Sequence, residues 1–296
     1  MNTTHTSLKP LSTLLKDTWS LYRKHMNSLA LVSIIPFIFG AVAMTLRPEL
    51  AVNHQAYLGI LAVLAVFNVL HLVFSLIMPV ALITTIDEMS HGRAHHVNAA
   101  YKKAFSVAIP YLFILILSCI VALGGSVLLI IPGIIVNTYL MFVVYVFLLE
   151  GKRGMDALIQ SAWYVRGFWL AVFGRKISIA IFAFIALLIF TAIAGALTFL
   201  GGFNSPVLAF LIDLFAFMFI VPFTVCFTYL VYRNLRAIKE HTVHHAAFAQ
   251  EAEKIFIILM VIASVAALTA FTLFVFWPGH FSGVTILRTS SILNYH

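Results

Sequence analysis

The strongest constraint on this chain is a series of seven apolar stretches with the composition of membrane-spanning helices. A spanning helix needs about 20 predominantly apolar residues. Charged residues make up only 9% of the 296 residues, whereas soluble domains carry roughly 25%. Lipid is therefore the expected solvent for much of the surface. The sequence predicts an all-α polytopic membrane protein with spans at residues 28–46, 57–86, 107–130, 134–149, 177–200, 206–232 and 255–277.

The third and fourth stretches follow one another without a polar loop. Pro132 and Gly133 separate them. Proline removes a backbone donor and glycine permits a tight reversal, so this pair is the natural helix breaker. We expect a hairpin with its tip at the outer face. The alternative is one long kinked helix, which would invert every later span.

The distribution of basic residues favours the hairpin. With it, all but two of the 18 lysines and arginines fall in cytoplasmic segments, the exceptions being Arg47 and Arg288. Basic residues concentrate in cytoplasmic loops of membrane proteins. The sequence therefore predicts a cytoplasmic N-terminus and an external C-terminus. Residues 1–250 form the expected six-span domain, and residues 251–296 add a helix and a short external tail.

The net charge of +8 does not indicate nucleic-acid binding, because no basic patch carries a recognisable binding module. Such an excess in a membrane protein usually meets anionic lipid headgroups at the cytoplasmic face. Two histidine groups, His91/His95/His96 and His241/His244/His245, have metal-like i, i+4 spacings within them. We interpret them as solvated loop residues, and we predict no metal site and no cofactor.

Three cytoplasmic segments are amphipathic, with apolar residues every three or four positions. They begin near Leu11, Tyr101 and Met155, and their aromatic residues Trp19, Phe105 and Trp163 are the expected interfacial anchors, together with Glu150 and Ser161. Such helices lie along the membrane surface with basic residues at the headgroups. Because each one precedes a pair of spans, we predict a threefold repeat of interfacial helix plus hairpin, followed by one extra span.

The segment at residues 131–169 resembles the membrane domain attached to some bacterial glycerophosphodiester phosphodiesterases, and the related YciC-like inner-membrane proteins. The resemblance is carried by Pro132-Gly133 opening a span, Glu150-Gly151 closing it, Ala157-Leu158, Ser161 and residues 167–169; residues 14–25 and 230–240 resemble the family's ends. The similarity covers about residues 8–240. It implies a six-span unit in a bacterial cytoplasmic membrane. It does not imply catalysis, because the phosphodiesterase activity of fused members belongs to a separate soluble barrel.

A few polar residues inside the apolar stretches are candidates for a site. Asp213 is the only acidic residue deep inside a stretch, and such a carboxylate should face protein or water. Asn68 and His71 lie one turn apart, and Asn137 and Tyr139 follow the hairpin. They indicate either a polar pocket between the second, fourth and sixth spans or simple hydrogen bonds between helices.

Three functions are compatible with these patterns. The first is a lipid-interacting scaffold or accessory protein that binds anionic headgroups, with a protein partner or further copies of itself. The second is a transporter or channel for a small solute or lipid that uses a polar pocket near Asp213. The third is an intramembrane enzyme, disfavoured because the sequence contains no phosphate loop, nucleophile elbow or paired catalytic carboxylates.

Overall fold

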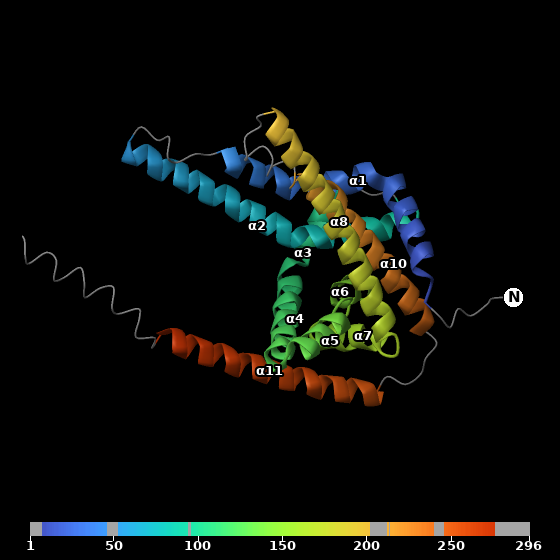
Figure 1. Cartoon of the computed structure of the whole chain (residues 1–296). Helices are drawn as coiled ribbons and strands as arrows, with labels where there is room; N and C mark the ends of the chain where they lie inside the picture. Colours follow the sequence, from blue (N-terminus) through green and yellow to red (C-terminus); the bar gives the residue numbers. More distant parts are fainter. Residues whose placement is uncertain are drawn as a thin grey trace, which may run out of the picture.

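The computed structural model describes residues 8–45, 53–93, 96–201, 212, 214–239 and 246–275, and its regular elements in these ranges are all helices. Figure 1 shows them in sequence colours. The helices are α1 (Leu11–Thr45), α2 (His54–Ser90), α3 (Val97–Ser106), α4 (Ala108–Leu128), α5 (Ile130–Tyr139), α6 (Val143–Glu150), α7 (Met155–Val165), α8 (Trp169–Gly201), the π-helical turn η2 (Ala216–Ile220), α10 (Val221–Lys239) and α11 (Ala246–Val275).

Seven helical segments of the described chain are long and apolar enough to cross a membrane, as the sequence predicts. They are Leu11–Ala43, His54–Ser90, Ala108–Leu128, Ile130–Glu150, Trp169–Leu197, Met218–Lys239 and Phe248–Ala270. Large apolar side chains on α2, α8 and α11 are exposed along most of each helix. Exposed apolar patches of this extent are rare on soluble monomers. The seven helices therefore indicate a multi-pass membrane protein.

The helix α1 combines the predicted amphipathic segment with the first span. His25 has non-helical dihedral angles (φ −122°, ψ 17°) and kinks the helix between these two parts. In the first part, Leu14, Thr18 and Tyr22 are buried, whereas Trp19 is 55% exposed. The buried face is therefore one regular i, i+4 stripe, and Trp19 lies beside it.

Two prolines inside helices leave carbonyl groups that other helices satisfy. Pro36 in α1 lacks the N–H that would bond to the carbonyl of Val32 four residues earlier. The Tyr101 hydroxyl of α3 donates to that oxygen at 2.7 Å.

Pro222 in α10 frees the carbonyl of Met218 in the same way. The Tyr22 hydroxyl of α1 donates to that oxygen at 3.1 Å. Both tyrosines therefore tie a proline-containing helix to a neighbour.

The reversal between α4 and α5 occurs at Leu129 and not at Pro132-Gly133. Leu129 is the only non-helical residue between the two helices, with extended dihedral angles (φ −176°, ψ 163°). Pro132 lies in the first turn of α5, where a helix needs no N–H donor. Gly133 packs against α4, because a Cβ there would lie 2.6 Å from Ser126 Oγ. The glycine is needed for close helix packing and the proline for starting the helix.

The predicted fourth span is divided into two helices, α5 and α6, with a break at residues 140–142. Ser161 of α7 bonds to the backbone at this break. Its Oγ donates to the Tyr139 carbonyl at 2.6 Å and accepts from the Phe142 N–H at 3.1 Å. One buried hydroxyl therefore supplies both the donor and the acceptor that the interrupted helix requires.

The helix α7 differs from the expected interfacial helix. All residues from Ala157 to Val165 are buried, including the polar Gln160 and Ser161. Trp163 is only 6% exposed and lies between Phe248 of α11, at 5.5 Å between ring centroids, and Lys239 of α10. Among the polar residues of this pattern, Ser161 bonds to the backbone at the break after α5, whereas Asp156 is exposed. The threefold repeat stays a prediction.

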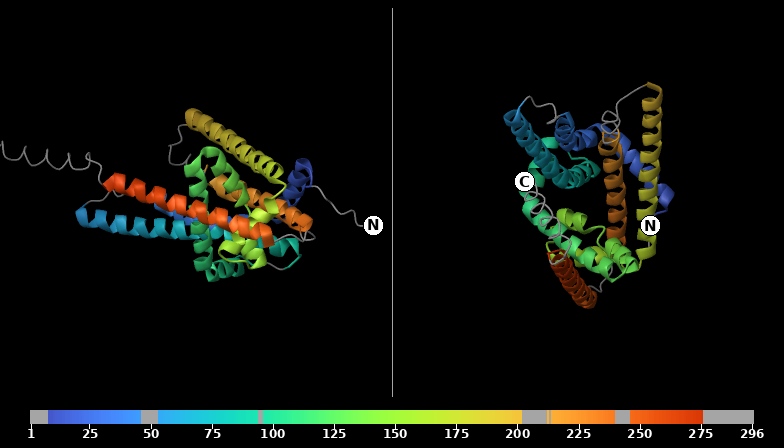
Figure 2. Two further views of the ribbon diagram at one scale, coloured as in Figure 1. Left: turned by 90° about the horizontal axis from the view of Figure 1, so that it is seen from below. Right: turned by 60° about the vertical axis from the view of Figure 1, so that its left-hand side comes forward.

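The helix α4 runs steeply across the direction of α2 and α11 in Figures 1 and 2. Its lower end meets α11, where Gly124 permits very close contact. A Cβ on Gly124 would lie 1.9 Å from the Leu259 carbonyl oxygen, closer than any nonbonded contact allows. The neighbouring Gly125 faces Val136 of α5. Two adjacent glycines therefore let α4 pack against two different helices.

We expect Gly124→Ala to destabilise the protein by about 2 kcal/mol or more, because overpacking a fixed backbone contact forces helices apart. Gly174→Ala is the matched control, since a Cβ at Gly174 meets nothing within 4 Å. It should be neutral or slightly stabilising, because alanine favours helices. Unfolding in mixed detergent micelles, followed by circular dichroism, measures both. Equal stabilities would contradict the packing of α4 on α11.

Candidate functional site

The polar residues Asn68 and His71 of α2 both contact backbone carbonyl groups. The Asn68 side chain is exposed and donates to the Leu64 carbonyl of its own helix at 2.8 Å. His71 contacts the Pro36 carbonyl of α1 through Nδ1 at 2.8 Å, and its ring packs on Gly40. A carbonyl oxygen only accepts, so Nδ1 carries the hydrogen in this contact. The His71 contact joins α2 to α1, whereas the Asn68 contact lies within α2.

The expected pocket between the second, fourth and sixth spans is not assembled from the described residues. Asp213 lies outside them. Asn68 and His71 are on α2, whereas Asn137 and Tyr139 belong to α5 and contact other helices. The Asn68 and His71 side chains contact the Leu64 and Pro36 carbonyls, whereas Asn137 contacts Lys176 of α8.

Asn137 and Tyr139 instead line two separate pockets beside α5. The first has a volume of about 420 Å³ and is lined by residues of α4, α5 and α8, among them Ser126, Asn137, Thr138 and Lys176. The Lys176 ammonium donates to the Asn137 side-chain oxygen, and at 3.4 Å to its backbone oxygen. This pocket therefore combines an apolar wall with one cation.

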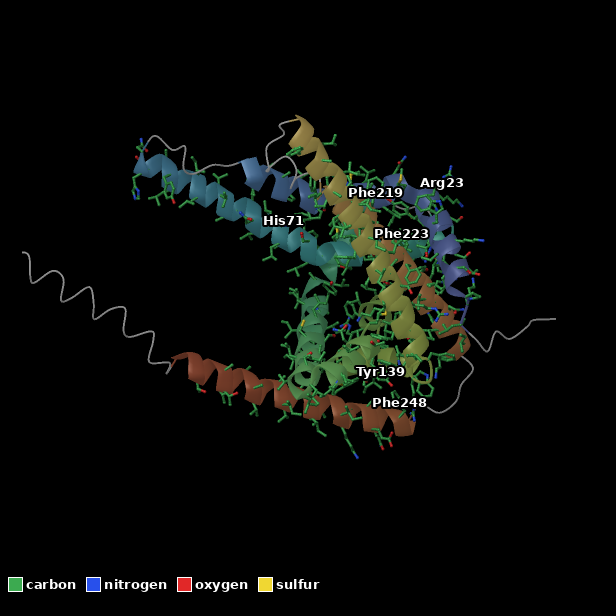
Figure 3. All side chains as sticks on the ribbon, viewed as in Figure 1. Arg23, His71, Tyr139, Phe219, Phe223 and Phe248 are labelled. Carbon is green, nitrogen blue, oxygen red and sulfur yellow. The ribbon has the colours of Figure 1, made fainter. Side chains whose placement is uncertain are left out.

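The second pocket has a volume of about 330 Å³ and lies between α5, α7 and α11. Tyr139 and Phe248 line it and lie close together in Figure 3, well away from His71. Arg166 and Glu251 also line it, and the Arg166 guanidinium stacks over the Phe248 ring at 4.5 Å. Both signs of charge are therefore present in the second pocket.

Glu150 is the centre of a polar cluster at the end of α6. Tyr164 of α7 and Tyr232 of α10 both donate their hydroxyls to its Oε1, at 2.8 and 2.5 Å. Arg236, one turn after Tyr232, is close enough to interact electrostatically with the carboxylate. Hydrogen bonds to a charged group contribute about 1.5–3 kcal/mol each. Glu150 thus joins three helices, a larger structural role than the predicted interfacial anchor.

Burial raises the pKa of Tyr164 above its usual range, and the hydrogen bond to Glu150 raises it further. The physical cause is that a phenolate would be desolvated and would face a carboxylate. Tyr164 therefore remains a protonated donor at neutral pH.

A second carboxylate cluster forms at the end of α2. The Tyr229 hydroxyl donates to Asp87 Oδ1 at 2.9 Å and contacts the Ser90 hydroxyl at 2.7 Å. Arg93 forms an ion pair with Asp87 Oδ2 at 3.1 Å. Because Tyr229 and Tyr232 are both on α10, this one helix binds the ends of both α2 and α6.

Sequence reasoning missed Asp87, Tyr164, Tyr229 and Tyr232. The available signal was that Asp87 directly follows the second apolar stretch and Glu150 directly follows the fourth. The sequence YLVYRNLR at residues 229–236 places two tyrosines one turn apart, each followed four residues later by an arginine. This spacing puts all four side chains near one another on the helix.

Two of the predicted anchors lie at the surface. Phe105 of α3 is 43% exposed, beside exposed Lys102 and Lys103, and packs edge-on against Phe74. Trp19 lies 6.4 Å from Phe223 between ring centroids. Both aromatic side chains are therefore held by the protein on one side and exposed on the other.

The histidine groups lie only partly in the described chain. His91 contacts Asp87, and His96 precedes α3, whereas His95, His241, His244 and His245 lie outside the described residues. The described residues contain no group of three or more histidine, cysteine, aspartate or glutamate side chains that could hold a metal ion.

Comparison with models of protein families, with curated proteins and with solved structures gives no match. The resemblance of residues 8–240 to the phosphodiesterase-associated membrane domain therefore remains an expectation.

We expect Tyr232→Phe to lower the free energy of unfolding by about 1.5–3 kcal/mol, because Glu150 loses one of its two hydroxyl donors while the ring stays in place. Tyr111→Phe is the matched control. Tyr111 is also buried, but its hydroxyl has no hydrogen-bond partner among the described residues, so its loss should change stability by no more than about 0.5 kcal/mol. Equilibrium unfolding in mixed micelles measures both. A Tyr232→Phe variant as stable as the control would contradict the role of the Glu150 cluster.

Proposed function

We propose that this chain is a membrane-embedded scaffold that interacts with anionic lipids at the cytoplasmic face of a bacterial inner membrane. The observation that carries the proposal is the exposed surface of α3 and the start of α4. There, Phe105 and Ile109 are exposed beside Lys102 and Lys103. An aromatic and an aliphatic side chain next to two ammonium groups match the boundary between acyl chains and anionic headgroups.

The opposite face of α3 explains how this surface is held. Ala100, Tyr101 and Ala104 are buried, and the Tyr101 hydroxyl bonds to α1. The lipid-facing side chains are therefore presented by a helix anchored in the protein core. The positive-inside distribution of most basic residues supports the same orientation. Lys176 departs from it, because it lies beside the reversal between α4 and α5, which that orientation places at the outer face. Asp213, on which the transport alternative depends, lies outside the described residues, so no observation favours that alternative.

The proposal predicts that the reconstituted protein selects phosphatidylglycerol over phosphatidylcholine. Electron spin resonance of spin-labelled lipids in vesicles measures the relative association of each with the protein. The double variant Lys102→Gln/Lys103→Gln should weaken the preference about thirtyfold, because each lysine near an anionic surface contributes about 1 kcal/mol and about 1.4 kcal/mol corresponds to a factor of ten.

The matched control is Lys152→Gln/Arg153→Gln, which removes the same charge from an exposed pair between α6 and α7. It should weaken the preference less, because that pair lies in the loop between α6 and α7 and not beside Phe105 and Ile109. A wild-type protein that associates equally with both lipids would refute the proposed function.

A further inference from the structure

Lys176 has unusual surroundings for a cation in an apolar helix. It lies on α8, is partly buried, and lines the pocket of about 420 Å³. Its ammonium group donates to the backbone and side-chain oxygens of Asn137. Among the described residues, no carboxylate lies within ion-pair distance of its ammonium, and none lines the pocket. Within the described part of the chain, amide and carbonyl dipoles therefore balance the positive charge.

A charge in an apolar environment is costly unless an opposite charge accompanies it. An anion in the pocket would reduce this cost. The side-chain oxygen of Asn137 accepts from Lys176, so its two amide hydrogens remain to donate to another acceptor. Lys176 and Asn137 together therefore offer N–H donors from a cation and an amide, which suits a phosphate group.

The second pocket beside α5 provides the contrast. Arg166 lines it together with the carboxylate of Glu251, and its guanidinium is stacked on Phe248. An anion there would meet a negative charge as well as a positive one. None of the described residues that line the pocket at Lys176 has a carboxylate, so this pocket is the better anion site.

The rim of the Lys176 pocket indicates where the anion comes from. Ile130, Ile134 and Ile177 line the pocket and are 79%, 40% and 40% exposed. All three lie in helices that are apolar enough to span a membrane. An apolar rim favours an acyl chain and offers nothing to a hydrated phosphate ion. The volume also lies within the usual range of ligand pockets, about 300–1,000 Å³.

We propose that Lys176 and Asn137 bind the phosphate group of one anionic phospholipid, whose acyl chain lies along Ile130, Ile134 and Ile177. This inference rests on the proposed lipid-interacting function and adds a defined site to it. The site is separate from the surface at Phe105, because it lies between α4, α5 and α8.

The test is native mass spectrometry of the full chain in detergent, titrated with phosphatidylglycerol. Wild-type protein should retain one tightly bound lipid. Lys176→Gln should bind this lipid at least about tenfold more weakly, since a charged hydrogen bond is lost. Lys254→Gln, an exposed lysine on α11, is the control for charge and should bind as wild type. Unchanged affinity in Lys176→Gln would overturn the site.

A second variant keeps the test decisive if Lys176→Gln does not fold. Asn137→Asp places a carboxylate beside Lys176, so it should balance the ammonium and repel phosphate. We expect this variant to be at least as stable as wild type and to lose the tightly bound lipid. Gln250→Glu, which adds the same charge at an exposed position on α11, should keep it. Retention of the lipid by Asn137→Asp would overturn the proposal.

Inorganic phosphate distinguishes the two sources of the anion. Phosphate in excess should not displace phosphatidylglycerol from the wild-type protein, because the acyl chain contributes to binding. Displacement by phosphate alone would overturn the lipid assignment. If wild-type protein prefers phosphatidylglycerol in vesicles but the Lys176 and Asn137 variants bind it normally, the site fails while the proposed function stands. If wild-type protein shows no preference, both fail.

Discussion

Apolar surroundings require that every backbone group freed by a helix interruption find a partner within the protein. Three interruptions in this chain are satisfied by hydroxyl groups from other helices. Tyr101 bonds to the carbonyl freed by Pro36, and Tyr22 to the one freed by Pro222. Ser161 bonds to both sides of the break between α5 and α6. These interruptions therefore join helices together, because each partner comes from a different element.

The same need for hydrogen-bond partners explains why α10 is bonded to both α2 and α6. Asp87 and Glu150 end two helices that are far apart in sequence, and each accepts a tyrosine hydroxyl from α10. A carboxylate at the end of an apolar helix needs donors, and a tyrosine supplies one while its ring stays buried. The Tyr232 ring also stacks on Tyr145 at 5.6 Å between centroids. Hydrogen bonds and ring packing therefore both hold α10 against its neighbouring helices.

Local composition was sufficient to predict seven apolar helices, because length and hydropathy depend on neighbouring residues alone. The reversal at Leu129 was missed by three residues, since proline is tolerated in the first turn of a helix as well as before it. The break between α5 and α6 depends on Ser161, 19 residues away from Phe142. The burial of α7 likewise depends on α10 and α11 covering it. Such contacts have no local signal, and the Glu150–Tyr232 bond spans 82 residues.

The break after α5 also bears on the proposed lipid site. Had the fourth span continued as one helix, Asn137 and Tyr139 would belong to an uninterrupted apolar crossing. Instead, α5 is a separate ten-residue helix, packed on α4 through Gly133 and closed by Ser161. It carries Asn137 to Lys176 on one side and Tyr139 to Arg166 on the other. The helix α5 therefore lies between two pockets that each contain a cation, and among the described residues only the pocket at Lys176 has no carboxylate in its lining.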